Sequence, residues 1–134
     1  MKKSLDQERA RFAWNKVHER QGDEYTNLAK GAPALIMQSG LMPVLAFYHE
    51  KDKAHHKALL NHLCLWLQKL FPKQIPTASF EDVIRALMGS QQGNAAEHAQ
   101  FYRIATEEAL SILRWIRQFA AAVGGGSGGG TRNG

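Results

Sequence analysis

Apolar residues recur at helical spacing along most of this chain. One stripe lies within residues 52–71 and comprises Leu59, Leu63, Trp66 and Leu70. A second stripe lies within residues 95–122 and comprises Phe101, Ala105, Ala109, Ile112, Ile116 and Phe119. No segment shows the sustained alternation of apolar and polar residues that is typical of strands. The spacing therefore predicts an all-α fold, a compact bundle of five to six helices in one domain over residues 1–122.

Glycine and proline interrupt this pattern where helices are expected to begin or end. Ser4 with Gln7 predicts a capping box at the start of a first helix. The most apolar segment, residues 33–51, contains both Gly40 and Pro43. A glycine suits the end of a helix, and a proline suits the first turn of the next one. We therefore expect two short buried helices with a corner at Gly40.

Polar residues mark the starts of two further helices. Asp52 is expected to cap the helix over residues 52–71, and Ser79 a short helix over residues 80–88. The segment GSQQGN, residues 89–94, is expected to form a loop before the last helix.

The last residues of the chain differ in composition from the rest. Residues 124–134 read GGGSGGGTRNG. Such a composition is typical of a flexible linker. We expect residues 123–134 to be a linker or a scar left by cloning, outside the helical domain, which leaves the natural C-terminus open.

Positive charge is concentrated in the first part of the chain. Residues 1–75 hold 12 Lys and Arg against 7 Asp and Glu, whereas residues 76–134 hold 5 of each. This asymmetry favours an anionic partner along one face, although a solvated basic surface would give the same pattern. Phosphate oxygens would explain lysines near a helix start, where they oppose the helix dipole. The candidate residues for binding an RNA backbone are Lys16, Arg20, Lys30, Lys51, Lys53 and Lys57.

Aromatic residues are sparse around these cations. Trp14 and Tyr48 lie near basic residues but form no regular platform on which bases would stack. Binding is therefore expected to follow the phosphate backbone and to ignore the bases.

The sequence contains no pattern typical of a catalytic, metal or cofactor site. His55 and His56 are adjacent and point to different sides of a helix, and no H-E-x-x-H motif is present, so surface histidines are expected. Cys64 lies among leucine and tryptophan residues, which predicts a buried, protonated thiol. No segment is apolar over the ~18–20 residues that a bilayer requires, and the N-terminus lacks the apolar stretch of a signal peptide. We expect a cytoplasmic protein that does not bind membranes.

Two segments resemble the small subunit of type III-B CRISPR RNA-guided effector complexes, the Cmr complexes. In YTNLAKGAPALIMQSGLMPVLAFYHEK the matching residues are Tyr25, Pro33, Leu35, Ile36, Gly40, Leu41, Leu45, Ala46, Phe47 and Lys51. In ATEEALSILRWIRQFA they are Thr106, Glu107, Ala109, Leu110, Trp115, Arg117, Phe119 and Ala120. The resemblance covers about residues 5–122, and neither motif is catalytic. Pro43 and the glycine-rich tail depart from the family pattern.

The resemblance implies a helical bundle without enzymatic activity that acts in antiviral defence. Members of this family stack as a minor filament and support the pairing of guide RNA with target RNA. The implied partners are the backbone and large subunits of the complex, further copies of the chain, guide RNA and target RNA. Two other interpretations stay open. One is a helical adaptor that binds only protein and keeps its basic face for solubility, and the other is a hydrolase with a metal at His55 and His62.

Overall fold

The computed structural model describes residues 4–20 and 22–128, with side chains as far as Gly124. These residues form six helices and no strand, which confirms the all-α fold class. The helices are α1 (Leu5–Glu19), α2 (Asp23–Ser39), α3 (Leu41–Lys51), α4 (Ala54–Leu70), α5 (Phe80–Met88) and α6 (Ala95–Gly128).

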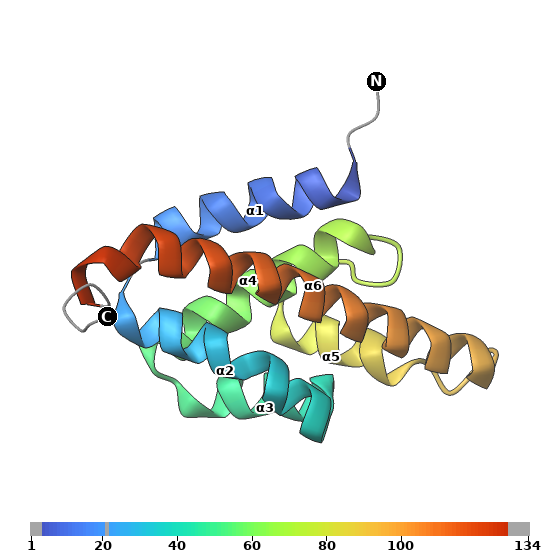
Figure 1. Ribbon diagram of the computed structural model, residues 1–134. Helices are drawn as coiled ribbons and strands as arrows, with labels where there is room; N and C mark the ends of the chain where they lie inside the picture. The colour runs from blue at the N-terminus through green and yellow to red at the C-terminus, as the bar shows by residue number, and fades with distance from the viewer. Residues whose placement is uncertain (1–3, 21, 129–134) are drawn as a thin grey trace.

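The longest helix, α6, organises the bundle (Figure 1). α1 lies beside α6, while α2, α4 and α5 also pack against α6. The predicted stripes of α4 and α6 face the core between these helices. Their fully buried members are Leu59, Leu63, Trp66, Ala105, Ala109, Ile112 and Ile116. Within the described part of the chain, no helix combines the length and apolarity needed to cross a membrane.

The predicted helix boundaries at Ser4, Gly40 and Ser79 are confirmed. The Ser4 side chain accepts a hydrogen bond from the backbone of Gln7, whose side chain reaches back to complete a capping box. Ser79 caps α5 in the same way through the backbone N–H of Asp82, at 3.1 Å. Gly40 joins α2 to α3 with φ of 96°, a backbone conformation that favours glycine. These boundaries depend on residues within four positions, which is why the sequence alone predicts them.

The predicted role of Asp52 is wrong. α4 begins at Ala54 with Lys53 as its N-cap, and Asp52 instead ends α3 in the left-handed conformation, at φ 59° and ψ 24°. Aspartate tolerates this conformation better than most residues. An ion pair of 2.8 Å between Asp52 and the Nζ of Lys57 spans the turn. The carboxylate therefore holds the corner between α3 and α4, and no side chain caps α4.

The last helix is longer than expected. It continues to Gly128, whereas the sequence predicted an end at residue 122, so residues 123–128 of the expected linker are helical. Each residue added to an existing helix gains one hydrogen bond, so the ~1 kcal/mol cost of a glycine does not forbid continuation. The rest of the expected linker, residues 129–134, lies outside the described residues.

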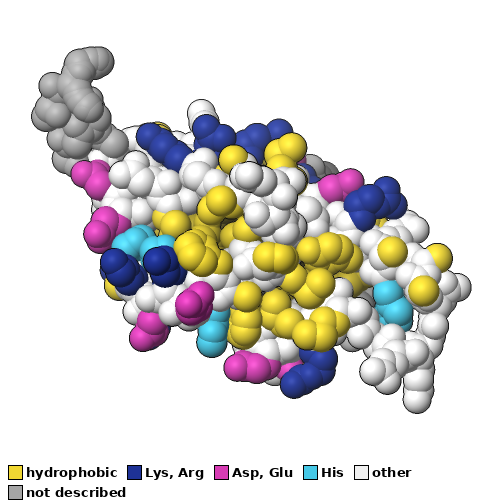
Figure 2. All heavy atoms as spheres, turned by 90° about the horizontal axis from the view of Figure 1, so that it is seen from below, with side chains coloured by type: hydrophobic (Ala, Val, Ile, Leu, Met, Phe, Trp, Pro, Cys, Tyr) yellow, Lys and Arg dark blue, Asp and Glu magenta, His cyan; other side chains and the backbone are white. Residues whose placement is uncertain are grey.

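Apolar side chains gather in a band across the face of the molecule opposite α1 (Figure 2). Met88 of α5 is 66% exposed. Phe80, Ile84 and Met88 line a shallow apolar hollow along α5. An exposed apolar band of this kind is typical of a surface that contacts another protein.

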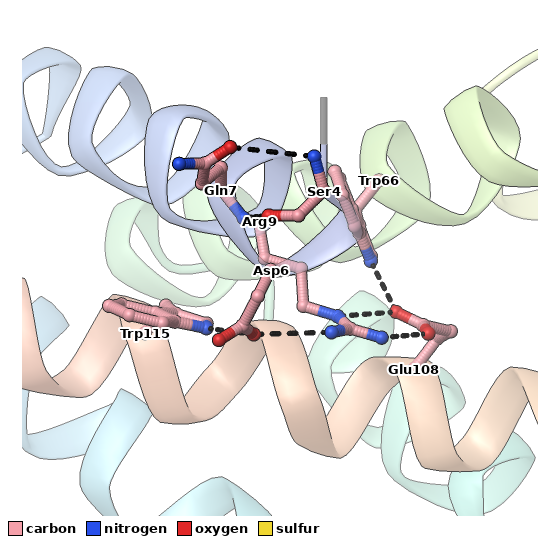
Figure 3. A network of polar contacts seen from close by, with 7 residues as sticks. All are labelled: Ser4, Asp6, Gln7, Arg9, Trp66, Glu108 and Trp115. Atoms are coloured by element: carbon pink, nitrogen blue, oxygen red, sulfur yellow. Dashed lines mark hydrogen bonds and ion pairs between the residues drawn. The ribbon is translucent and has the colours of Figure 1, made fainter. Parts of the chain in front are cut away.

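A polar network attaches α1 to the rest of the bundle (Figure 3). α1 buries only Ala13 and Val17 completely, and its Phe12 ring packs partly buried against Trp66. Arg9 Nε donates to Glu108 Oε1 at 3.1 Å, and the buried indole of Trp66 donates to the same oxygen at 3.2 Å. The hydrogen bond to Glu108 raises the pKa of Arg9. Glu108 therefore joins α1, α4 and α6.

Candidate nucleic-acid interface

Three of the predicted basic residues meet where α3 turns into α4. Lys51 ends α3, Lys53 is the N-cap of α4, and Lys57 lies in the first turn of α4. All three side chains are exposed. We call these three residues the lysine cluster. The tight turn at Asp52 brings them to one end of the molecule.

The start of α4 favours an anion. Its first turn contains no acidic residue, and the N-cap residue, Lys53, has no side-chain acceptor for the free backbone N–H groups there. Unpaired N–H groups and the positive end of the helix dipole attract anions. The ion pair between Asp52 and Lys57 neutralises part of the charge and lowers the pKa of Asp52 through its hydrogen bond with Lys57. The exposed Lys51 and Lys53 side chains remain the principal cations of the cluster.

The aromatic residue beside the cluster is Phe47, one helical turn before Lys51. The Nζ of Lys51 lies 5.3 Å from the centroid of the Phe47 ring, within the range of a cation–π contact. Tyr48, the aromatic residue that the sequence places near these lysines, is fully buried, and burial raises its pKa to about 12. The spacing of four between Phe47 and Lys51 in a predicted helix was the signal that could have identified the pair.

Two of the four histidines in residues 49–62 contradict the expectation of surface histidines, whereas His49 is exposed. His56 and His62 are buried, at 8% and 3% exposure. Burial, together with His55, Lys51 and Lys53, lowers the pKa of His56. Burial lowers the pKa of His62 to about 4. Both histidines lie on the core side of α4, together with the apolar stripe of that helix.

The other predicted basic residues lie on other elements. Lys16 and Arg20 are at the end of α1, where Lys16 Nζ pairs with Glu19 at 3.1 Å and Arg20 is half-buried. Lys30 lies exposed on α2. Figure 1 shows the end of α1 and the α3–α4 turn at the same end of the molecule, with the start of α2 between them.

Acidic residues separate the two basic groups. α2 begins with Asp23 and Glu24, and Glu24 lies 3.6 Å from Nδ1 of His55 on α4. The six predicted residues therefore do not form one continuous positive surface. The lysine cluster is the part of the set that the fold brings together.

Metal ligands and the Cys64 thiol are the two features of the described residues that bear on catalysis. No group of three or more His, Cys, Asp or Glu among them is placed to hold a metal ion. Cys64 is buried, and burial raises the pKa of its thiol to about 12. A thiol with so high a pKa stays protonated at neutral pH and is a poor nucleophile.

Comparison with known proteins agrees with the resemblance noted from the sequence. The family model described as CRISPR-associated protein (Cas_Cmr5) matches residues 5–123. A relative from Thermus thermophilus, named CRISPR system Cmr subunit Cmr5, is 32% identical over 118 residues, which cover 85% of this chain and 90% of the relative. The family match reaches all six helices and stops within α6, close to where the glycine-rich residues begin. The chain belongs to the Cmr5 family of CRISPR-associated proteins.

Proposed function

We propose that this chain is a non-catalytic small subunit of a type III-B CRISPR effector complex and that its lysine cluster contacts the phosphate backbone of RNA. Family membership over residues 5–123 is the observation that carries the proposal. The name of the relative, a Cmr subunit, supports assembly with other subunits of such a complex. Three exposed lysines at an uncapped helix start support contact with a polyanion.

The mode of binding follows from the chemistry of lysine. An ammonium group is a compact charge that contacts phosphate oxygens without reading base edges. Binding is therefore weakly dependent on sequence and strongly dependent on salt, because each neutralised phosphate releases counterions. Lys16, Arg20 and Lys30 would add contacts only to an RNA that also passes the acidic start of α2.

Contacts with protein would use the apolar band opposite α1. The apolar hollow on α5 and the exposed Met88 favour protein contacts on this face, where water is excluded on association. We assign the band to docking on the backbone and large subunits and to stacking of further copies as a minor filament. Guide RNA and target RNA would then lie along the end of the molecule that carries the lysine cluster.

Charge reversal within the cluster tests this function. The double variant Lys51→Glu, Lys53→Glu is compared with a control, Lys69→Glu, Lys73→Glu, that makes the same change in net charge at two other exposed lysines. Fluorescence anisotropy with single-stranded RNA should show at least about tenfold weaker binding for the cluster variant and a salt slope smaller by about 1.4. Equal losses in both variants would mean that net charge alone drives binding and would refute the assignment.

Co-purification tests the subunit role separately. The chain is expressed with the other Cmr subunits and a guide RNA, and co-elution is followed at rising salt. Association is expected, with a contribution from RNA that is lost as salt increases. Association that persists unchanged at high salt, combined with no RNA binding by the isolated chain, would favour the helical adaptor that binds only protein.

A further inference from the structure

Phe47 differs from the large apolar side chains beside it on α3 in its exposure. Leu45 and Tyr48 are fully buried, whereas 43% of Phe47 is accessible. A single exposed phenylalanine is common on protein surfaces and has no meaning alone. Phe47 is notable because the cationic side chain of Lys51 lies over its ring.

The rings around Phe47 hold it in place without covering it by stacking. His56 meets the Phe47 ring at 87° with centroids 6.4 Å apart, and Tyr48 meets it at 45° with centroids 6.0 Å apart. The nearby pair of His49 and Phe80 shows the contrast, because its rings are nearly parallel, at 13°, with centroids 4.1 Å apart. The His49–Phe80 stack is already closed, whereas Phe47 has no parallel partner among the described residues.

The surroundings of Phe47 match the two parts of a nucleotide. The Nζ of Lys51 lies over one face of the ring, and the part of the ring that stays accessible offers a flat apolar surface to a base. Base–aromatic stacking is favourable for every base because each has a π-face. Lys51 and Lys53 offer positive charge to the flanking phosphates, and the uncapped start of α4 adds unpaired N–H groups. A protein surface suited only to apolar contact would not require cations at this edge.

We infer that Phe47 and the lysine cluster form a binding site for an unpaired nucleotide, with the base stacked on the Phe47 ring and the flanking phosphates on Lys51 and Lys53. This inference rests on the proposed function, because it specifies how the same cluster binds RNA. The ligand is single-stranded, since the faces of bases inside a duplex are already stacked on one another. Phe47 thus supplies a base contact that neither Trp14 nor Tyr48 was expected to provide.

Two substitutions at Phe47 separate stacking from apolar contact. Phe47→Leu keeps an apolar side chain but removes the ring, and Phe47→Tyr keeps the ring. Each protein is titrated against two fluorescein-labelled probes of about ten nucleotides, an oligouridine and an abasic strand with the same phosphates. Far-UV circular dichroism and Tm verify that each variant is folded.

Wild-type protein and Phe47→Tyr should bind the oligouridine about tenfold more tightly than the abasic strand. Phe47→Leu should bind the two probes equally, at the affinity that the wild-type protein has for the abasic strand. The inference is overturned if Phe47→Leu keeps the preference for oligouridine, or if wild-type protein shows none. It is also overturned if Phe47→Leu leaves RNA binding intact and abolishes only co-elution with the other subunits, because Phe47 would then be a protein contact.

The failure of this inference can be distinguished from failure of the proposed function. If Lys51→Glu, Lys53→Glu weakens binding to both probes while Phe47→Leu weakens neither, the cluster binds phosphates and the base site alone is refuted. If the charge-reversal variant binds both probes as tightly as wild type, the proposed function and this inference are refuted together.

Discussion

Replacing Glu108 by glutamine should destabilise the protein by about 2 kcal/mol. Arg9 and Glu108 are only 16% and 13% exposed, respectively, at their side chains. Removing one partner of a fully buried ion pair costs ~3–5 kcal/mol, whereas an exposed pair contributes ~0–1 kcal/mol. The two side chains lie between these limits, closer to the buried one. Because Asp6 still pairs with Arg9 at 3.2 Å in the variant, we place the cost just below the buried range.

Glutamine and alanine at this position test different parts of the network. The glutamine amide oxygen can still accept from the indole N–H of Trp66, so Glu108→Gln removes mainly the charge. Glu108→Ala also leaves this donor without its partner, and Trp66 is fully buried. An unsatisfied buried donor costs ~1–3 kcal/mol more. We therefore expect Glu108→Ala to be destabilised by about 3–5 kcal/mol in total.

The neighbouring glutamate provides a matched control. Glu107 lies on the same helix and is exposed, so Glu107→Gln should change stability by no more than about 0.5 kcal/mol. Urea unfolding followed by tryptophan fluorescence and circular dichroism measures each difference. A double-mutant cycle with Arg9→Met should give a coupling energy of at least about 1 kcal/mol. Equal effects of the Glu107 and Glu108 substitutions, or strict additivity with Arg9→Met, would refute this account of how α1 is attached.

Two further predictions concern residues inside the fold. Burial lowers the pKa of His62 to about 4 from an ordinary value near 6.5. Between these two pH values the unfolded chain binds more protons than the folded chain. The free energy of unfolding should therefore fall as pH drops from 6.5 to 4, by up to about 3 kcal/mol. His62→Gln, which can still bond the Tyr25 hydroxyl, should reduce the dependence of the urea midpoint on pH across that window, with the buried His56 responsible for part of what remains. An unchanged dependence would contradict the assignment. Gly40→Ala should lower stability by about 1–3 kcal/mol because of its φ of 96° and a Cβ position 3.2 Å from the Tyr102 hydroxyl. Gly31→Ala, in open space within α2, should instead raise stability by up to about 1 kcal/mol. Thermal unfolding measures both variants, and a change in Tm of the same sign for Gly40→Ala and Gly31→Ala would refute the argument.

The features that the sequence predicts well are those decided by nearby residues. The capping box at Ser4 and the cap at Ser79 each involve a partner three positions away. Asp52 shows the limit of such local reasoning, because an aspartate between two helices suits either the end of the first or the start of the second. The length of the turn decided between these roles, and the sequence does not specify that length.

The features that the sequence does not predict depend on contacts across the fold. Glu108 pairs with Arg9, which is 99 positions away, and Tyr25 bonds His62 at a separation of 37. From the sequence, both Glu108 and His62 are ordinary polar residues on amphipathic helices. Only the packing of α1, α2 and α4 shows that they are enclosed. The exposure of Phe47 is unpredictable for the same reason, since it lies in the most apolar segment of the chain.

The starts of α4 and α5 give the clearest physical argument for a site at the lysine cluster. α5 begins with a serine cap and has Glu81 and Asp82 in its first turn, the arrangement that best satisfies free N–H groups and the helix dipole. α4 begins with Lys53 and Lys57, has no acid in its first turn, and lacks a side-chain cap. The same chain thus optimises one helix start for stability and leaves the other unfavourable by itself. Such local conflicts are expected at functional positions, and a bound phosphate would supply at α4 the negative charge that Glu81 and Asp82 supply at α5.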